Sequence, residues 1–281
     1  GSTPPAAPER TADVAPVSQE RRPRPIPPLP RIIAIANQKG GVGKTTTTVN
    51  LGACLADIGY RVLVVDLDPQ GSLTFSLGID PEDLDITVGE VLLGTSPAED
   101  AIVITDDGLH LLPSNVSLSQ AEEQLVGRTG REQRLRVALA KVAHDYDWIL
   151  LDCPPALGVL TVGALSAADS VLIPIQAETL AHRGVGQLLD TIHDVKKFIN
   201  SKLTVMGVLP TMYDGRTTHA QNVVRAIGDT YQLTVVTPPI PRTIRFAEAP
   251  AYGRSILDTA ASHKGADAYR EVAAGMLAAQ T

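Results

Sequence analysis

A short glycine-rich loop near residue 40 holds the residues with the clearest chemistry. It reads Lys39-Gly40-Gly41-Val42-Gly43-Lys44-Thr45-Thr46 and lies between an apolar run at 32–36 and a helix-compatible segment. A strand, a glycine-rich turn and a helix N-terminus in this order form a phosphate-binding loop, because glycines let backbone N–H groups close around phosphate oxygens. Lys44 can reach the β- and γ-phosphates of a nucleotide, and the Thr45 hydroxyl can bind Mg²⁺.

The loop departs from the general pattern G-x-x-x-x-G-K-[ST] at its first glycine position. This departure places a second lysine, Lys39, at the start of the loop. The alternative interpretation is a glycine-rich turn with two solvated lysines. The flanking strand and helix, together with acidic residues farther along the chain, favour the phosphate loop.

Three aspartates lie at the ends of predicted buried strands. The strand at 61–68 ends in Asp66 and Asp68, and a second strand, which begins near residue 146, ends in Asp152. Continuous apolar runs fit parallel strands covered on both faces, whose carboxyl ends form the ligand edge of an open α/β sheet. We therefore expect Mg²⁺ to be held by Thr45, Asp68 and Asp152. Asp68 can also orient the attacking water, and Asp66 supports either the metal or the geometry of the loop.

The remaining elements must bring these residues together. Strands are predicted at 109–113, 170–175 and 203–209, and helices at 46–59, 130–144, 184–199 and 267–279. A further helix begins at 117, residues 72–108 are irregular to helical, and a helix and a strand precede residue 240. This alternation predicts an α/β fold with a mostly parallel, twisted sheet and helices on both faces.

Length and composition fit one large α/β domain or two small ones. The chain has 281 residues, 44% hydrophobic and 4% aromatic, so its core must consist of Ala, Val, Leu and Ile. No apolar run approaches the ~20 residues that span a membrane, and we expect a cytoplasmic protein with two buried, reduced cysteines. Residues 1–30 hold nine of the 21 prolines and several arginines, which predicts a basic, disordered or polyproline-like tail before a domain at 31–281. Such a tail would solubilise the protein or weakly assist DNA binding.

Five motifs together resemble one family. KGGVGKTT, VDLDPQG, LLDCPP, TMYDGRT and PRTIRFAEAPAYG are similar to the ParA/MinD family of deviant Walker A ATPases, and the last two to its chromosome-partitioning ParA/Soj branch. The resemblance implies a P-loop NTPase fold and hydrolysis of ATP with Mg²⁺. It makes Lys39, Lys44 and Asp68 catalytic, and residues 39–46 nucleotide-binding. Lys39 is then the lysine that crosses a homodimer interface to the partner's phosphates.

The same resemblance assigns roles in the C-terminal third. Met212, Pro241 and Thr243 match positions near the adenine, and Arg216 and Arg245, with Arg242 beside them, match a surface that binds double-stranded DNA non-specifically. Residues 201–270 carry eight Lys/Arg and five Asp/Glu, a net charge of 8 − 5 = +3, whereas the whole chain carries −7. Scattered solvated arginines, or an internal ion pair of Arg245, are the alternatives.

The resemblance implies a segregation ATPase that works on the nucleoid with a ParB-type centromere-binding partner. A related ATPase that positions another cargo on the same DNA remains an alternative. A MinD-like membrane ATPase would need a basic amphipathic C-terminal helix, and residues 271–281 contain no Lys or Arg. The chain departs from the family at Ser72, at Ala156 and in the segment 176–183, which contains His182. These departures concern the switch region and the stimulation by a partner.

Overall fold

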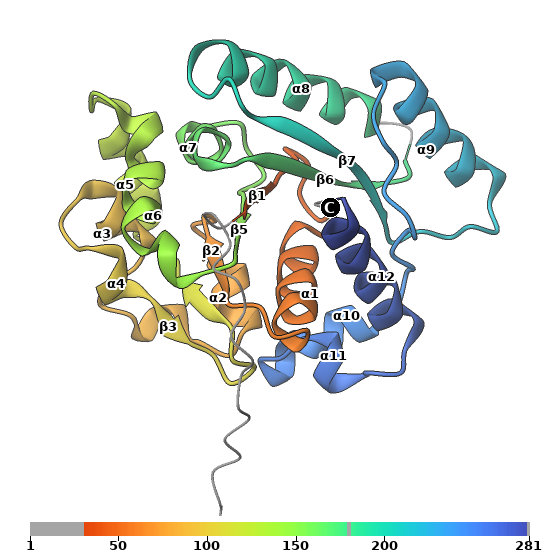
Figure 1. Cartoon of the computed structure of the whole chain (residues 1–281), viewed down its shortest axis with the longest axis horizontal. Coiled ribbons are helices and arrows are strands. Elements are labelled where there is room, and N and C mark those ends of the chain that lie inside the picture. Colours follow the sequence, from red (N-terminus) through yellow and green to blue (C-terminus); the bar gives the residue numbers. More distant parts are fainter. Residues whose placement is uncertain (1–30, 179–180, 280–281) are drawn as a thin grey trace, which may run out of the picture.

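The computed structural model describes residues 31–178 and 181–279, and the predicted tail at 1–30 lies outside the described residues. A seven-stranded sheet has the order β3-β4-β2-β5-β1-β6-β7 (Figure 1). All neighbouring strands are parallel except β3 and β4. The strands are β1 (Arg31–Ile35), β2 (Val62–Asp66), β3 (Val103–Ile104), β4 (His110–Leu112), β5 (Trp148–Asp152), β6 (Ser170–Gln176) and β7 (Thr204–Thr211).

Helices cover both faces of this sheet, as the sequence predicts. In Figure 1, α7 and α8 lie on one side of the sheet and α1 and α12 on the other. The helices are α1 (Lys44–Asp57), α2 (Ser72–Ser76), α3 (Val88–Leu93), α4 (Ala98–Ala101), α5 (Leu118–Val126), α6 (Arg134–Val142), α7 (Val159–Ala167), α8 (Ala181–Phe198), α9 (Thr218–Tyr231), α10 (Arg245–Glu248), α11 (Ile256–Thr259) and α12 (Lys264–Ala278). Short 3₁₀ turns are η1 (Pro81–Asp83), η2 (Arg131–Gln133), η3 (Ala143–Asp145) and η4 (Ala249–Tyr252).

The two faces of the sheet form separate apolar clusters. One cluster joins the sheet to α3, α5, α6, α7 and α8 through residues such as Leu139, Ala164 and Leu188. The other joins it to α1, α2 and α12 through residues such as Leu51, Leu73 and Tyr269. Strands β2 and β5 are buried along their whole length, as expected for parallel strands covered on both faces.

Several predicted boundaries were wrong. Helix α1 begins at Lys44, two residues before the predicted start, because Gly43 takes the left-handed conformation and ends the loop there. The strand predicted before residue 240 is reduced to a single bridge between Val208 and Val235. Strand β2 ends at Asp66, so Asp68 lies in the following turn. The two-residue strand β3 and the helix α7 were not predicted.

No helix in the described ranges is long and apolar enough to cross a membrane. Helix α12 ends the described chain and packs on α1, where the Tyr269 hydroxyl lies 3.0 Å from Thr47 Oγ1. Tyr269 is fully buried. This part of the chain is therefore an integral layer of the domain.

Candidate functional site

The glycine-rich loop lies where β1 passes into α1. Gly41 and Gly43 have φ of 73° and 86°, a left-handed backbone that favours glycine. The end of β7 supports the loop, because Thr211 Oγ1 donates a 2.7 Å hydrogen bond to the carbonyl oxygen of Val42. The loop is thus fastened to the carboxyl edge of the sheet, with its backbone N–H groups at the start of a 14-residue helix.

Lys44 is buried within the loop itself. Its Nζ donates a 2.9 Å hydrogen bond to the carbonyl oxygen of Lys39 and so spans the loop. Burial lowers the pKa of Lys44, and the nearby Asp152 carboxylate opposes that shift. A phosphate anion in the loop would give this ammonium the counter-charge that its buried position requires.

Thr45 and Asp152 form a pair suited to Mg²⁺. Thr45 Oγ1 donates a 2.7 Å hydrogen bond to Asp152 Oδ2, and Asp152 Oδ1 is buried without a hydrogen-bond partner in the described part of the chain. Burial raises the pKa of Asp152 well above its ordinary value, and the neighbouring Asp66 adds to that rise. A hydroxyl and an unsatisfied carboxylate oxygen are the hard ligands that Mg²⁺ takes beside phosphate oxygens. The residues present fit a Mg²⁺–nucleotide complex.

Asp66 fixes the turn that follows β2 and the position of α2. It is fully buried, and its carboxylate accepts three hydrogen bonds, from Asp68 N at 3.1 Å, Thr74 N at 2.9 Å and Thr74 Oγ1 at 2.8 Å. Burial raises its pKa to about 6, against these hydrogen bonds. Both carboxylate oxygens of Asp66 already accept hydrogen bonds. Of the two roles predicted for Asp66, a structural one therefore fits better than direct binding of the metal.

Asp68 lies in the turn that follows Asp66 and is half-buried. Its Oδ1 accepts a hydrogen bond from Gln70 N at 2.9 Å, and Ser114 Oγ donates to its carbonyl oxygen at 2.8 Å. Within the described residues, no group of three or more His, Cys, Asp or Glu side chains could hold a metal. Asp68 as a metal ligand therefore stays a prediction, and so does its part in orienting water.

Lys39 makes a surface ion pair. Its Nζ contacts Glu178 Oε2, and both side chains are partly exposed. Asn37 Oδ1 accepts a hydrogen bond from Lys39 N at 3.0 Å and so shapes the start of the loop. A cavity of about 380 Å³ opens beside Lys39, between the loop, the end of β6 and the start of α8. Sequence reasoning did not identify Glu178 or Asn37, although Asn37 directly follows the apolar run that leads into the loop.

The residues predicted to lie near the adenine come from two segments that pair with each other. Tyr213 and Pro241 form a parallel bridge, with Tyr213 N donating to Ile240 O at 2.9 Å. This pairing brings the surroundings of Met212 and Pro241 together directly after Thr211, which holds the phosphate loop. Met212 takes a left-handed φ of 47°. Thr243 lies farther along, with Oγ1 3.4 Å from His263 Nε2. Adenine binding by these residues remains a prediction.

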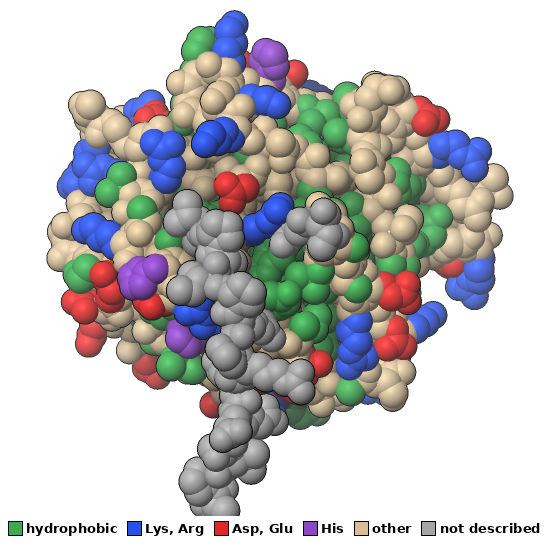
Figure 2. All heavy atoms as spheres, in the orientation of Figure 1, with side chains coloured by type: hydrophobic (Ala, Val, Ile, Leu, Met, Phe, Trp, Pro, Cys, Tyr) green, Lys and Arg blue, Asp and Glu red, His purple; other side chains and the backbone are tan. Residues whose placement is uncertain are grey.

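The three candidate DNA-binding arginines are exposed. Arg216 forms a two-pronged ion pair with Asp214 at 2.9 Å, which lowers the pKa of that carboxyl to about 2. Arg245 pairs with Glu248 at 2.9 Å. Figure 2 shows Lys/Arg and Asp/Glu side chains next to one another on the side where α9 and α12 lie. The basic side chains of residues 201–270, whose net charge is +3, therefore lie among carboxylates and do not form a purely basic patch.

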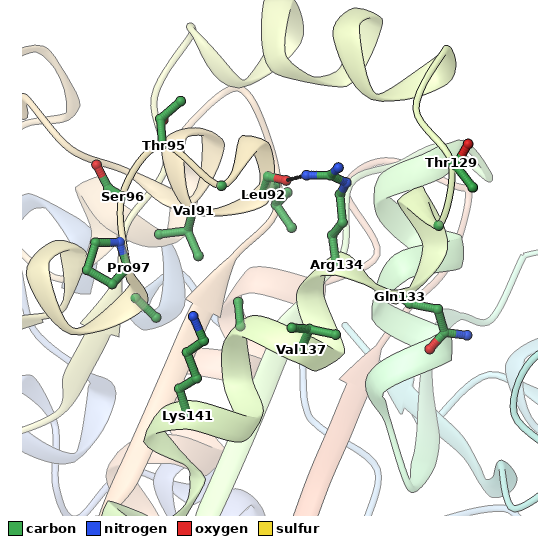
Figure 3. Close-up of a pocket in the computed structure, with 14 residues that line it drawn as sticks. Val91, Leu92, Thr95, Ser96, Pro97, Thr129, Gln133, Arg134, Val137 and Lys141 are labelled. Carbon is green, nitrogen blue, oxygen red and sulfur yellow. Dashed lines mark hydrogen bonds between the residues drawn. The ribbon is translucent and has the colours of Figure 1, made fainter.

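A separate cavity of about 510 Å³ lies between α3 and α6 (Figure 3). Arg134 points from α6 toward the end of α3, where its Nη1 donates to Leu92 O at 3.1 Å. Lys141 lines the same cavity. None of the predicted site residues lies here, and the arginine fastens the end of one helix to the next.

Comparison with known proteins identifies the family. Residues 30–205 match the family described as AAA domains. The sporulation initiation inhibitor protein Soj of Bacillus subtilis is 46% identical over 244 residues, which are 86% of this chain and 96% of Soj. The chromosome partitioning protein ParA of Caulobacter vibrioides is 42% identical over 246 residues, 86% of this chain and 92% of that protein. The chain belongs to the ParA/Soj family of partitioning ATPases.

Solved structures agree with the P-loop fold predicted for a ParA/Soj protein. A Mycobacterium smegmatis structure described as cobyrinic acid a,c-diamide synthase, with bound ADP and magnesium, is 52% identical. It covers 88% of this chain and 94% of its own, with a TM-score of 0.80. The fold and the resemblance inferred from the motifs are therefore confirmed.

Ser72 and Ala156, which depart from the ParA/Soj motifs, and His182, in the third departing segment, lie at the ends of helices or in the turns beside them. Ser72 is the first residue of α2, and the carbonyl oxygen of Ala156 accepts a 2.6 Å hydrogen bond from Thr161 Oγ1. The carbonyl oxygen of His182 accepts a hydrogen bond from the Tyr231 hydroxyl at 2.8 Å, and the two rings lie 6.1 Å apart. His182 thus joins α8 to α9.

Proposed function

We propose that this protein is a Mg²⁺-dependent ATPase whose ATP-bound form dimerises and binds double-stranded DNA non-specifically, in chromosome or plasmid segregation. The observation that carries the proposal is that the two lysines of one loop lie in different environments. Lys44 is buried and spans its own loop, whereas Lys39 lies at the rim, paired with Glu178. Among the described residues, Lys39 Nζ contacts Glu178 alone. Because this ion pair is exposed, the lysine can turn to the phosphates of a second subunit at little cost, about 0–1 kcal/mol.

The residues of each subunit divide the chemistry of phosphoryl transfer. The loop amides and Lys44 bind and orient the phosphates, which spreads the charge that develops on the transferred group. Thr45 and Asp152 would hold Mg²⁺, which would neutralise phosphate charge. Asp68 lies one turn beyond the strand end and orients the attacking water. Lys39 of the second subunit completes the site, so hydrolysis waits for dimerisation.

The exposed arginines supply the DNA contacts. Arg216 and Arg245 sit in ion pairs with Asp214 and Glu248 that solvent surrounds. Such pairs contribute little to stability, so a DNA phosphate can replace the carboxylate. It would accept the two-pronged hydrogen bonds that Arg216 now donates to Asp214, and the single one that Arg245 donates to Glu248. A ParB-type partner that stimulates hydrolysis would then release the dimer from the nucleoid.

Co-sedimentation with DNA in ATP, in ADP and without nucleotide tests this proposal. The wild-type protein should sediment with DNA only in ATP. Lys39→Ala should bind nucleotide as a monomer but lose both the dimer and the DNA, whereas Arg245→Glu should keep the dimer and lose only the DNA. Arg136→Glu makes the same charge change at an exposed residue of α6 and serves as the control. Equal sedimentation of wild type and Arg245→Glu would refute the arginine surface.

The name of the M. smegmatis structure offers a second candidate, the amidation of a corrinoid acid. Release of ammonia from a glutamine amide would require an activated nucleophile, such as a cysteine thiolate. Cys54 and Cys153 are both buried, and burial raises the pKa of Cys54 to about 12. Neither thiol is suited to such attack. Glutamine-dependent ATP turnover with a corrinoid acid would favour this candidate, and DNA-dependent turnover would favour segregation.

A further inference from the structure

Two glycines far apart in the sequence touch through their backbones. Gly78 follows α2, and Gly253 ends the turn η4. A Cβ added to Gly253 would lie 2.6 Å from Gly78 Cα and 3.0 Å from Gly78 N. A Cβ added to Gly78 would lie 3.3 Å from Gly253 Cα. Because side chains are excluded here, the two chain segments meet with almost no room to spare.

The Gly78 side of this contact leads to the nucleotide site. Helix α2 is tied to Asp66 through Thr74, whose N and Oγ1 both bind the carboxylate. Ser114 reinforces the tie, since its N donates to Thr74 Oγ1 at 3.0 Å and its Oγ donates to Asp68 O at 2.8 Å. A shift of the turn at Asp68 therefore carries α2 and Gly78 with it.

On the Gly253 side, the chain leads back through η4 to the arginine segment, which is the helix α10 with Arg245. In the other direction, hydrogen bonds hold the backbone of the residues that follow Gly253. Ser255 N donates to Asp107 Oδ2 at 3.0 Å, and Ile256 N donates to Asn50 Oδ1 at 3.0 Å. Ser255 and Ile256 are both buried. On its other side Gly253 adjoins η4 and α10, where Arg245 is exposed and Phe246 packs edge-to-face on Tyr269. A displacement at Gly253 would therefore act on these two short helices.

We propose that the Gly78–Gly253 backbone contact couples the nucleotide state at Asp68 to the position of the arginine segment at α10. This inference rests on the proposed ATP-dependent DNA binding and names how that binding is regulated. The coupling is reciprocal, because a contact that lets ATP raise the affinity for DNA must let DNA raise the affinity for ATP by the same factor. Coupling of this kind typically amounts to about 5–150-fold.

Gly253→Ala tests the contact. The added methyl group must push η4 away from α2, so the ratio of DNA affinities in ATP and in ADP should fall at least about fivefold from that of the wild type. The affinity of ATP, measured with and without DNA, should lose the same factor. Dimerisation in ATP should persist, because neither glycine lies in the loop or beside Lys39.

Gly130→Ala is the matched control. Gly130 has φ of 69°, close to the 64° of Gly253, but a Cβ there would meet nothing within 4 Å. It therefore carries the same backbone strain without the collision, and it should keep the wild-type ratio. If Gly253→Ala also keeps that ratio while remaining folded by circular dichroism, the contact does not transmit the nucleotide state.

Gly78→Ala completes a double-mutant cycle. Because both methyl groups act on one contact, the double variant should lose less coupling than the sum of the single losses. Additive losses would overturn the proposal, and so would single variants with unchanged coupling. If the wild-type protein does not bind DNA in ATP, the proposed function is refuted. If the wild type binds DNA and the variants keep its ratio of DNA affinities in ATP and in ADP, only the coupling is refuted.

Discussion

Asp152 is a single residue whose burial as an ionised carboxylate opposes stability. It is fully buried beside Asp66, and one of its oxygens lacks a hydrogen-bond partner within the described chain. Burial raises its pKa well above the ordinary value, so the folded protein binds a proton that the unfolded chain has already released. Stability therefore falls as the pH rises from the unfolded pKa toward the raised folded value. Bound Mg²⁺ would remove this penalty.

Asp152→Asn should for this reason stabilise the metal-free protein while it abolishes hydrolysis. We expect the melting temperature at pH 7.5 to rise by roughly 2–4 °C, the effect of about 1 kcal/mol in a domain of this size. The gain should shrink at pH 5, where wild-type Asp152 is more fully protonated. Asp66, with a pKa near 6, titrates in both proteins. Calorimetry at the two pH values measures the difference, and a larger gain at pH 5 would contradict the explanation.

Most single residues of the phosphate loop could be predicted, because they act within a short contiguous motif. The structure places Lys44, Thr45 and Asp152 together as expected, with a 2.7 Å bond between the last two. Glu178 could not be predicted, since it lies 139 residues from Lys39 and is joined to it only by the fold. The contact of Thr74 with Asp66 was not predicted either. The two residues are only eight positions apart, but their contact depends on how α2 folds back toward the end of β2.

The Thr74 side chain ties helix α2 to β2 and to Ser114. Thr74 is fully buried, and its hydroxyl both donates to Asp66 Oδ2 and accepts from Ser114 N. Thr74→Val keeps the shape but removes both bonds, so Ser114 N loses this acceptor. The free energy of unfolding should fall by about 1–3 kcal/mol.

Urea denaturation measures this loss. Thr74→Ser is the matched control, because it keeps the hydroxyl and removes only a methyl group. It should lose less stability than Thr74→Val. If the serine variant proves the less stable of the two, packing of the methyl group outweighs the hydrogen bonds.

The elements differ in how far their sequences reveal them. Strands β2 and β5 are continuous apolar runs and were predicted. Helix α7 was missed because it is apolar on nearly all sides and so lacks the periodicity of a surface helix. Strand β3 has only two residues and exists through pairing with β4. The helices α10 and α11, of four residues each, depend on tertiary contacts in the same way.

The whole molecule binds DNA, in our proposal, as a pair of equal surfaces. Each phosphate contact releases counterions, so the logarithm of the affinity falls with the logarithm of the salt concentration by about 0.9 per contact. Arg216→Ala removes one arginine from each subunit of a dimer. The slope should therefore decrease by about 2.

Fluorescence anisotropy with labelled DNA between about 50 and 200 mM salt measures this slope. Arg136→Ala, on exposed α6, should leave it unchanged. A decrease of about 1 would mean that a single subunit faces the DNA. An unchanged slope in Arg216→Ala would remove this arginine from the surface.

The carboxylates beside Arg216 and Arg245 have a consequence for movement in the cell. In the single subunit, Asp214 and Glu248 offset much of the local positive charge, so the field that reaches the surrounding solution is weak. A subunit freed from the dimer would not be recaptured at once by the nearest stretch of DNA. In the proposed cycle it would diffuse some distance before it meets ATP and a second subunit again, and that delay would let the occupied region of the nucleoid differ from the depleted one.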